Sequence, residues 1–257
     1  MKTIYKIVKF IIKNNPSIKV PYYLTRAFVY QIFKRLTGGT ISIKLFNGKK
    51  IFLYPNCNIS TMFVYTNIPD KSEIDLLRDA SDNKTVFLDI GANIGSYSVL
   101  LLDKVKEVYA FEPHPFTAKR CKMNFLLNGH NEKQVLELAL SDSEGKIYFT
   151  DNKEQSSINK ISNSQENSIT VNVDTLDNFA QKFLSRDFNY IVKIDVEGFE
   201  KNVLRGGEFF FINYNVKIIT FECFAESRKE VFEIIKSFGY IVSQIDDNNF
   251  YAVKKGK

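Results

Sequence analysis

Several residue types and patterns are scarce in this chain of 257 residues, and each shortage excludes a class of protein. The only cysteines are Cys57, Cys121 and Cys223, which lie far apart without a C-x-x-C pair. That argues against a disulfide framework and a thiolate zinc site and fits a reducing compartment, so we expect a cytoplasmic protein. No apolar run approaches the roughly 18–20 residues of a membrane-spanning helix. With 44% hydrophobic and 25% charged residues, the chain is neither disordered nor collagen-like.

Acidic residues are absent from the first 69 positions, which nevertheless contain eleven Lys or Arg residues. The whole chain has a net charge of +6, so residues 70–257 carry −5. We therefore expect two parts, a basic extension (residues 1–69) and a mildly acidic body (residues 70–257). This asymmetry indicates an anionic partner, either a phospholipid surface or a nucleic acid.

Residues 1–37 are expected to form two helices. Lysines interrupt what would be the apolar core of a signal peptide, so secretion is not expected. In the first helix, the apolar residues share one face and lysines occupy much of the rest, as in helices that lie in the headgroup layer of an anionic membrane: Ile4, Ile7, Val8, Ile11 and Ile12. The second helix is expected from Tyr22 to Leu36. Three interpretations stay open: packing on the body, peripheral contact with the inner face of the membrane, and RNA binding.

The sequence pattern of the body predicts alternating strands and helices. A hairpin with an Asn47-Gly48 turn comes first. Short apolar runs then alternate with helical segments, and strands are expected at 86–90, 108–112, 135–140, 190–195 and 216–222, before a C-terminal hairpin over 240–253. This order predicts an α/β fold with a mostly parallel sheet, helices on both faces and an antiparallel C-terminal hairpin strand. The polar segment 151–168 is expected to be a solvated loop or a lid over the site.

A glycine-containing turn, Asp89-Ile90-Gly91-Ala92-Asn93-Ile94-Gly95, lies where the first body strand ends and a helix begins, which is where ligands bind in such folds. Its spacing differs from the dinucleotide pattern G-x-G-x-x-G. Asp89 would repel a pyrophosphate but attract a cation. S-adenosylmethionine (SAM) has an ammonium and a sulfonium group and no phosphate, and its carboxylate can bind the N–H groups at a helix start. The motif therefore favours SAM.

Carboxylates or hydroxyls also follow the next two strands. Glu112 can accept both hydroxyl protons of a ribose, which fits SAM and NAD equally. Ser141 and Asp142 follow the third strand. Either they contact the adenine edge of the cofactor, or they form an ordinary turn.

A third cluster lies in the segment Lys193-Ile194-Asp195-Val196-Glu197. Alternate residues of a strand face the same way, so we expect Lys193, Asp195 and Glu197 to line one side of its tip. Burying charged side chains in an otherwise apolar strand costs free energy unless they are paired or functional. Two interpretations follow: a structural Lys–Asp ion pair, or residues that bind the substrate. Glu222, at the tip of the next strand, is a further member. Two such carboxylates could also bind a divalent cation, but two candidate ligands do not establish a metal site.

The order DIGANIGSYS, AFEPHP, LALSDSEG, VNVDTLDNF and IVKIDVEGFEKNVLRGG resembles the FkbM-type methyltransferases over roughly residues 60–225. The resemblance implies a class I (Rossmann-like) methyltransferase fold with a seven-stranded sheet. It also implies SAM as the methyl donor and O-methylation, often of a sugar or glycan hydroxyl. By position, the cofactor residues would be Asp89, Gly91, Asn93, Gly95 and Glu112, and Lys193, Asp195 and Glu197 would form the second signature of the family.

The expected reaction is direct in-line displacement of the methyl group by a substrate hydroxyl, with Asp195 as the base, Glu197 orienting the acceptor and Lys193 keeping the carboxylates ionised. An RNA methyltransferase that uses the basic extension is one alternative. The absence of the Asn/Asp-Pro-Pro-aromatic motif for base amines argues against this nucleic-acid alternative, and a DNA substrate is not expected. A non-catalytic scaffold that docks on membranes is the other alternative, against which the carboxylates at the strand tips argue.

Overall fold

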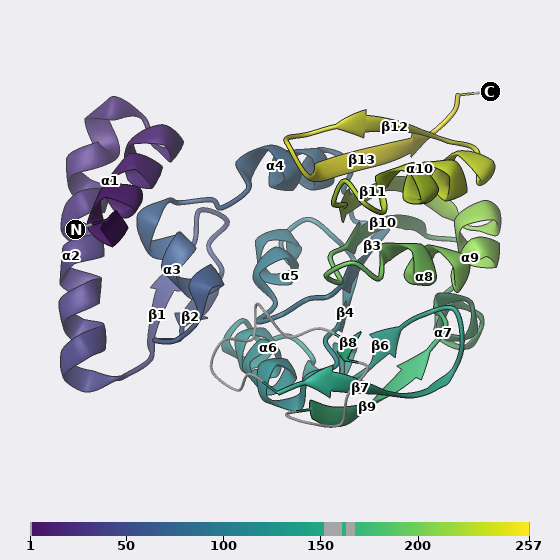
Figure 1. Cartoon of the computed structure of the whole chain (residues 1–257), viewed down its shortest axis with the longest axis horizontal. Helices are drawn as coiled ribbons and strands as arrows, with labels where there is room; N and C mark the ends of the chain where they lie inside the picture. The colour runs from purple at the N-terminus through teal and green to yellow at the C-terminus, as the bar shows by residue number, and fades with distance from the viewer. Residues whose placement is uncertain (1, 152–160, 163–167, 257) are drawn as a thin grey trace.

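The computed structural model describes residues 2–151, 161–162 and 168–256 (Figure 1). The basic extension contains α1 (Lys2–Asn14), α2 (Val20–Thr37), the hairpin β1 (Ile41–Lys44) and β2 (Lys50–Leu53), and α3 (Asn58–Tyr65). The body begins with α4 (Lys71–Asp79), and neither α3 nor α4 is among the elements that the sequence pattern predicts. The expected lid falls mainly on 152–160 and 163–167, which lie outside the described residues.

Seven strands form the central sheet, in the order β12 (Tyr240–Gln244), β13 (Asn249–Lys254), β11 (Asn215–Glu222), β10 (Asn189–Ile194), β3 (Thr85–Ile90), β4 (Glu107–Phe111) and β5 (Val135–Leu136). Strand β13 is antiparallel to both of its neighbours, and the pairs among β11, β10, β3, β4 and β5 are parallel. Every residue of β3 is buried, because helices cover both faces of a parallel sheet and leave no solvent side. The predicted mostly parallel sheet and its antiparallel hairpin strand are confirmed.

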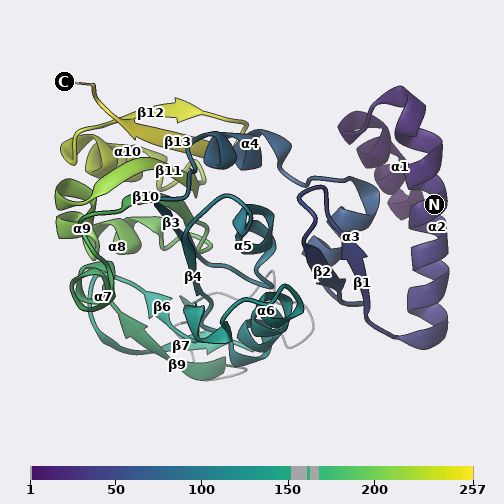
Figure 2. The same cartoon turned by 180° about the vertical axis from the view of Figure 1, so that it is seen from behind.

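Helices pack on both faces of this sheet (Figures 1 and 2). One face carries α4, α5 (Ser96–Leu101) and α6 (Pro115–Leu127), and the other carries α7 (Leu176–Phe183), α8 (Glu200–Arg205), α9 (Glu208–Asn213) and α10 (Arg228–Ser237). Alternate residues of β3 enter different cores: Phe87 packs with α5 and α6, whereas Val86 and Leu88 pack with the second group. Asp89 and Lys193 therefore point toward the α5 side.

The expected strand over 135–140 is divided between two sheets. Residues 135–136 form β5 of the central sheet, whereas β6 (Ala139–Leu140) belongs to a separate four-stranded sheet with β9 (Ser168–Asp174), β7 (Gly145–Thr150) and β8 (Ile161–Ser162). Sequence pattern does not show this division, because both pieces are apolar and strand pairing is decided by residues distant in the chain.

The extension packs on the body through a shared hydrophobic core. Ile11 of α1 and Tyr23 and Tyr30 of α2 are buried in the cluster that also contains Phe87, and β2 contacts α5 and α6. Polar contacts reinforce this packing, since Asn124 of α6 accepts a hydrogen bond from the backbone N–H of Phe52, at 2.8 Å. Residues 1–37 thus contribute to the core of the molecule.

Candidate functional site

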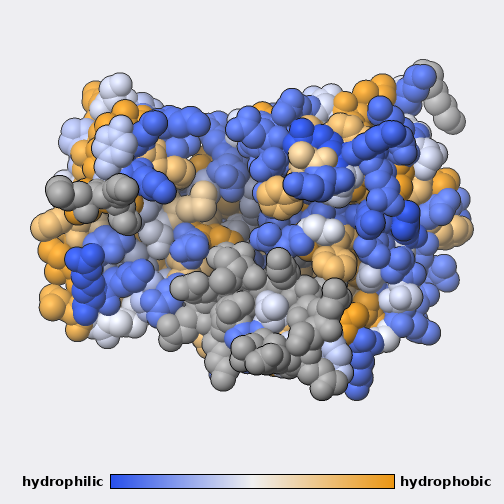
Figure 3. Space-filling view, viewed as in Figure 1, coloured by the Kyte–Doolittle hydropathy of each residue, from blue (hydrophilic) through white to orange (hydrophobic). Residues whose placement is uncertain are grey.

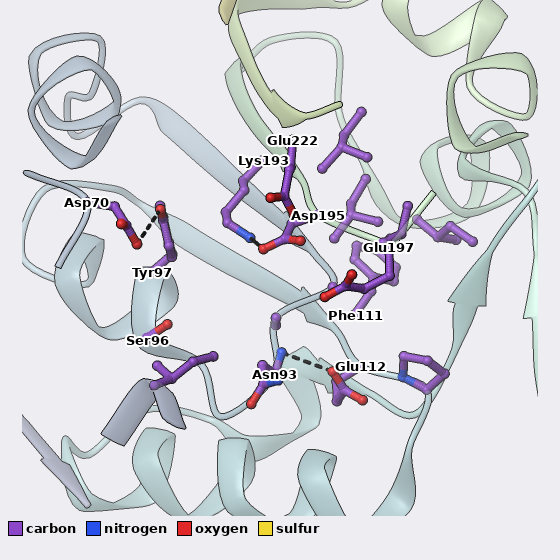
Figure 4. Close-up of a pocket in the computed structure, with 18 of the residues that line it drawn as sticks. Asp70, Asn93, Ser96, Tyr97, Phe111, Glu112, Lys193, Asp195, Glu197 and Glu222 are labelled. Atoms are coloured by element: carbon purple, nitrogen blue, oxygen red, sulfur yellow. Dashed lines mark hydrogen bonds and ion pairs between the residues drawn. The ribbon is translucent and has the colours of Figure 1, made fainter. Parts of the chain in front are cut away.

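A cavity of about 270 Å³ opens at the carboxyl ends of β3, β4, β10 and β11 (Figure 4). It is lined by the β3–α5 loop, the end of β4, the loop after β10, β6, α3 and the start of α4. This is the edge of a parallel α/β sheet at which ligands bind. Of the cofactor residues expected from the sequence, Gly91, Asn93 and Glu112 line the cavity, as do all three of the expected catalytic residues.

Glu112 is held rigidly at one end of the cavity. Its two carboxylate oxygens accept backbone hydrogen bonds, one from Asn93 N–H and one from His114 N–H, both at 3.0 Å. Burial raises the pKa of Glu112 to about 7, although these two hydrogen bonds favour the charged form. The apolar residues Phe111, next to Glu112 in the chain, and Phe149 also line the cavity. A carboxylate fixed beside apolar surface suits a ribose that bears a flat aromatic base.

Gly91 and Asn93 give the β3–α5 loop its shape. Both have left-handed backbone conformations, with φ of 82° and 52°. A Cβ atom on Gly91 would lie 1.8 Å from the carbonyl oxygen of Asp195, so only glycine allows this loop to cross so close to the loop after β10. The crossing is fixed by a hydrogen bond from Asp195 N–H to the Ile90 carbonyl oxygen, at 2.9 Å.

Asp89 lies beneath the cavity and does not line it. Its side chain is fully buried, and its Oδ2 atom accepts hydrogen bonds from the Ser98 hydroxyl at 2.6 Å and the Ser98 N–H at 3.1 Å. Burial raises the pKa of Asp89, opposed mainly by the nearby Lys193. The sequence pattern predicts that Asp89 contacts the cofactor directly. In this structure its carboxylate does not reach the cavity, because α5 covers it. Its negative charge still acts on the cavity through the low-dielectric interior.

Lys193 lies opposite Asp89 in the β10–β3 register and is 4% exposed. Its ammonium donates a hydrogen bond to Asp195 Oδ2 at 2.9 Å and lies 4.6 Å from the centre of the Tyr97 ring. Burial opposes the charged form, but the carboxylates of Asp195, Asp89 and Glu73 outweigh it and hold the pKa of Lys193 above its usual range. Lys193 is thus a buried cation within a group of acids.

Three carboxylates converge in the cavity, from the loop after β10 and the end of β11 (Figure 4). Ligand oxygens of Asp195, Glu197 and Glu222 all lie within 4.8 Å of one another. The sequence pattern predicts that Lys193, Asp195 and Glu197 share one side of a strand. Instead β10 ends at Ile194, and Glu197 lies in the following turn with φ of 52°, so the turn and not strand alternation brings it to Asp195. Burial raises the pKa of Glu222 to about 7, and the charges of Asp195 and Glu197 add to the effect. Oxygen donors in this arrangement suit a proton acceptor, sugar hydroxyls or a hard divalent cation.

Sequence reasoning missed the residues that form the side of the cavity nearest the extension. Asp70 and Glu73 line it at the start of α4, and the Tyr97 hydroxyl lies 2.8 Å from Glu73 Oε2 and 3.3 Å from Asp70 Oδ2. Helix α3 adds Ile59, Met62 and Phe63. One signal was available, because Asp70 is the first acidic residue of the chain.

Three further expected cofactor residues lie outside the cavity lining. Gly95 directly precedes α5 as its N-cap, with φ of 78°, and a Cβ there would lie 2.6 Å from Cys121 Sγ, so this glycine serves the packing of α5 on α6. Ser141 and Asp142 form a turn against α8: Asp142 accepts a hydrogen bond from the Asn202 side chain at 2.9 Å, and the Ser141 carbonyl contacts Gly206 closely.

The charges of the lining fit a cationic ligand. Six acidic residues line the cavity, against a single basic residue, Lys193, among the described residues: Asp70, Glu73, Glu112, Asp195, Glu197 and Glu222. Such a surface attracts the ammonium and sulfonium groups of SAM and repels the pyrophosphate of a dinucleotide. Glu112, Asn93 and Gly91 would hold SAM.

Residues 89–242 match the family model described as the methyltransferase FkbM domain. The chain belongs to the FkbM methyltransferase family. The matched residues make up more than half of the chain. The chain is 31% identical to the hexuronic acid methyltransferase AglP of Haloferax volcanii over 140 residues, which are 53% of this chain and 56% of that protein. The chain thus spans little more than half the length of this curated relative.

Solved structures with a similar arrangement include a SAM-dependent methyltransferase from Agrobacterium tumefaciens, at 9% identity and a TM-score of 0.45, with 86% of this chain and 71% of that chain covered. Another is a SAM-dependent O-methyltransferase from Thermotoga maritima, at 12% identity and a TM-score of 0.43, with 84% and 78% covered. Within the residues that the structure describes, no helix combines the length and the hydropathy needed to cross a bilayer.

Proposed function

We propose that this FkbM methyltransferase transfers the methyl group of SAM to a hydroxyl group of a sugar or glycan. The observation that carries the proposal is that one cavity contains both Glu112, fixed by two backbone hydrogen bonds, and the cluster of three carboxylates Asp195, Glu197 and Glu222. A ribose and a polyhydroxylated acceptor are both bound by fixed hydrogen-bond acceptors. The similarity to a hexuronic acid methyltransferase supports a sugar acceptor.

At the cofactor end, Glu112 would accept hydrogen bonds from the ribose hydroxyls, and the β3–α5 loop with Gly91 and Asn93 would surround the amino-acid part. When bound, SAM supplies an electrophilic methyl group on a sulfonium centre. The acidic lining would favour the cationic donor over its neutral product, S-adenosylhomocysteine, because the positive charge disappears in the reaction.

At the acceptor end, Asp195 would remove the proton of the attacking hydroxyl as the new oxygen–carbon bond forms and the sulfur–carbon bond breaks. One of its oxygens is held by Lys193 at 2.9 Å, which fixes the direction of the carboxylate. Glu197 and Glu222, whose carboxylate oxygens lie within 4.8 Å of those of Asp195, would orient the other acceptor hydroxyls. A positioned base of this kind contributes about 10²–10⁴-fold to the rate.

The test is transfer of a labelled methyl group from SAM to a panel of nucleotide sugars, free oligosaccharides and glycolipids. We expect label in an alkali-stable ether on a sugar carbon, found by mass spectrometry of the methylated product. Transfer to RNA or protein acceptors, with none to any sugar, would contradict the proposal.

We also propose that the outer faces of α1 and α2 lie on an anionic membrane, as a peripheral contact at its cytoplasmic side. The apolar face expected for the first helix is partly used in folding, since Ile7 and Ile11 pack inward. Large apolar side chains nevertheless remain outside, mixed with hydrophilic ones over these helices (Figure 3), and they are 43–89% exposed: Ile4, Tyr5, Ile12, Ile18, Tyr22, Phe28, Val29, Ile32 and Leu36.

Charge and exposed apolar side chains together support the membrane as the partner. Residues 1–69 contain eleven basic residues and no acidic one, and within the described part of the chain none of these eleven forms an ion pair with a carboxylate. Each Lys or Arg near an anionic surface adds about 1 kcal/mol of attraction, and exposed aromatic and aliphatic side chains enter the headgroup layer.

Deleting residues 1–37 would expose the core that Ile11, Tyr23 and Tyr30 fill, so we choose exposed positions in the intact protein. The double variant Phe28→Ser and Leu36→Ser should co-sediment with phosphatidylglycerol vesicles much less than the original protein. Phe183→Ser changes a residue of the body that is 62% exposed and serves as the control. Equal sedimentation of all three proteins, or retention of the original protein by RNA and not by vesicles, would overturn this proposal.

A further inference from the structure

A second groove adjoins the cavity on the side away from Glu112. It has a volume of about 360 Å³ and shares Pro69, Asp70 and Glu73 with the cavity. Its walls are the α1–α2 connection with parts of both helices, the segment between α3 and α4, and the turn between β12 and β13. In the space-filling view the surface is hollowed between the N-terminal helices and the α/β body (Figure 3). The two spaces therefore lie next to each other, with Pro69, Asp70 and Glu73 in the walls of both.

The lining of this groove suits a polyhydroxylated ligand. The amide nitrogen of Asn14 donates to the Phe10 carbonyl at 2.8 Å, and that of Asn15 donates to the carbonyls of Ile11 and Tyr65, both at 2.9 Å. These bonds fix the side chains and leave each Oδ1 atom as an acceptor in a set position. Exposed Asn67 and Ser72 add further polar groups from the opposite wall. The partly exposed ring of Phe10 supplies an apolar surface of the kind on which sugar rings lie.

Asp70 marks the junction of the two spaces. It is a non-glycine residue in the left-handed region, with φ of 50°, a conformation that costs free energy and is held in place by its surroundings. Its carboxylate lies 3.3 Å from the Tyr97 hydroxyl, so the side chain is held at the boundary, where it can reach ligand on either side.

We propose that this groove binds the further sugar units of an oligosaccharide acceptor, while the unit to be methylated lies at Asp195. The inference rests on the proposed function and names the acceptor as an oligosaccharide in place of a single sugar. The FkbM domain matches residues 89–242. Most groove residues come before this stretch in the chain, and those of the β12–β13 turn come after it. The whole groove therefore lies outside the residues that match the FkbM domain. The basic extension, the start of α4 and the β12–β13 turn would therefore set the acceptor length in this chain.

The test compares kcat/KM for mono-, di- and trisaccharide acceptors that end in the same methylated sugar. Ser72→Trp places a large ring in the groove from an exposed position on α4. Asp79→Trp, exposed at the other end of the same helix, is the matched control. In the original protein and the control, kcat/KM should rise about tenfold or more from mono- to trisaccharide, the effect of one or two additional hydrogen-bonded contacts. In Ser72→Trp this ratio should fall to about one.

A second readout does not depend on turnover. The chain contains no tryptophan, so Phe10→Trp introduces into the groove wall a single tryptophan, which can be excited selectively over the tyrosines. Its emission should change when the trisaccharide is titrated and should not change with the monosaccharide. A sugar acceptor that shows no length dependence, or a length dependence that Ser72→Trp leaves intact, would overturn the groove assignment while the proposed function stands. If no sugar of any length accepts the methyl group, the proposed function fails and the groove assignment fails with it.

Discussion

Replacing Glu112 by glutamine should separate the stability of this protein from its binding of SAM. The folded state raises the pKa of Glu112 from 4.5 to about 7, chiefly through burial. Below pH 4.5 the carboxyl group is protonated in both the folded and the unfolded chain. As the pH rises from 4.5 to 7, the unfolded chain releases this proton while the folded chain retains it, so the free energy of unfolding falls. Above pH 7 both states are ionised and the full cost is present.

The size of this cost follows from the difference between the two pKa values. At about 1.4 kcal/mol per pH unit, it amounts to about 3 kcal/mol at pH 8. The glutamine side chain in Glu112→Gln cannot titrate, but it also offers only one oxygen to the two N–H groups of Asn93 and His114, a loss of about 1–3 kcal/mol that does not vary with pH. The informative quantity is therefore the difference in unfolding free energy between the variant and the original protein. As the pH rises from about 4.5 to 8, this difference in unfolding free energy should shift by about 3 kcal/mol in favour of the variant.

Urea unfolding of both proteins at intervals between pH 5 and pH 8 measures this difference, and calorimetry at pH 8 measures SAM affinity. We expect the variant to bind SAM about tenfold or more weakly, because the ribose loses a charged acceptor. In the original protein, SAM affinity should rise as the pH passes through 7 and Glu112 ionises. A stability difference that is flat with pH would refute the argument that burial of this carboxylate is costly, and unchanged SAM affinity would remove Glu112 from the binding site.

Two further predictions concern the loops that meet above the sheet. Asp195→Asn should abolish methyl transfer and leave the calorimetric affinity for SAM nearly unchanged, and retained turnover would show that Asp195 is not the base. Gly95→Ala should destabilise the protein by about 1–3 kcal/mol in urea unfolding, because of the left-handed backbone and the approach of its Cβ to Cys121. Cys121→Ala should recover part of that loss when combined with Gly95→Ala, and a double variant no more stable than Gly95→Ala would show that Cys121 is not the obstacle.

The parallel sheet was predictable because each of its strands is a short apolar run between helical segments. In β3, the run Val86-Phe87-Leu88 is buried from both faces, and such a strand can be recognised without knowledge of its neighbours. The helices α3 and α4 escaped prediction for the opposite reason. Their burial against α2 and the sheet depends on contacts with distant residues, which leave little trace in the local pattern.

The candidate site was predictable in part, because the carboxyl ends of parallel strands meet at one edge of the sheet. That rule correctly brings Gly91, Asn93, Glu112 and Asp195 to a common cavity. It does not say which side chains face the cavity, and the burial of Asp89 under α5 is a matter of how a helix packs on its strand.

By itself, the sequence determined the family, the alternation of strands and helices in the body, and the acidic strand ends, since these depend on local patterns of residue type. Only the tertiary structure decided that Lys193 is a buried cation among acids, that a turn and not a strand brings Glu197 to Asp195, and that the basic extension forms part of the cavity wall. The physical reason is that charge burial, close backbone approach and cavity shape arise from residues far apart in the chain, and these meet only when the chain has folded.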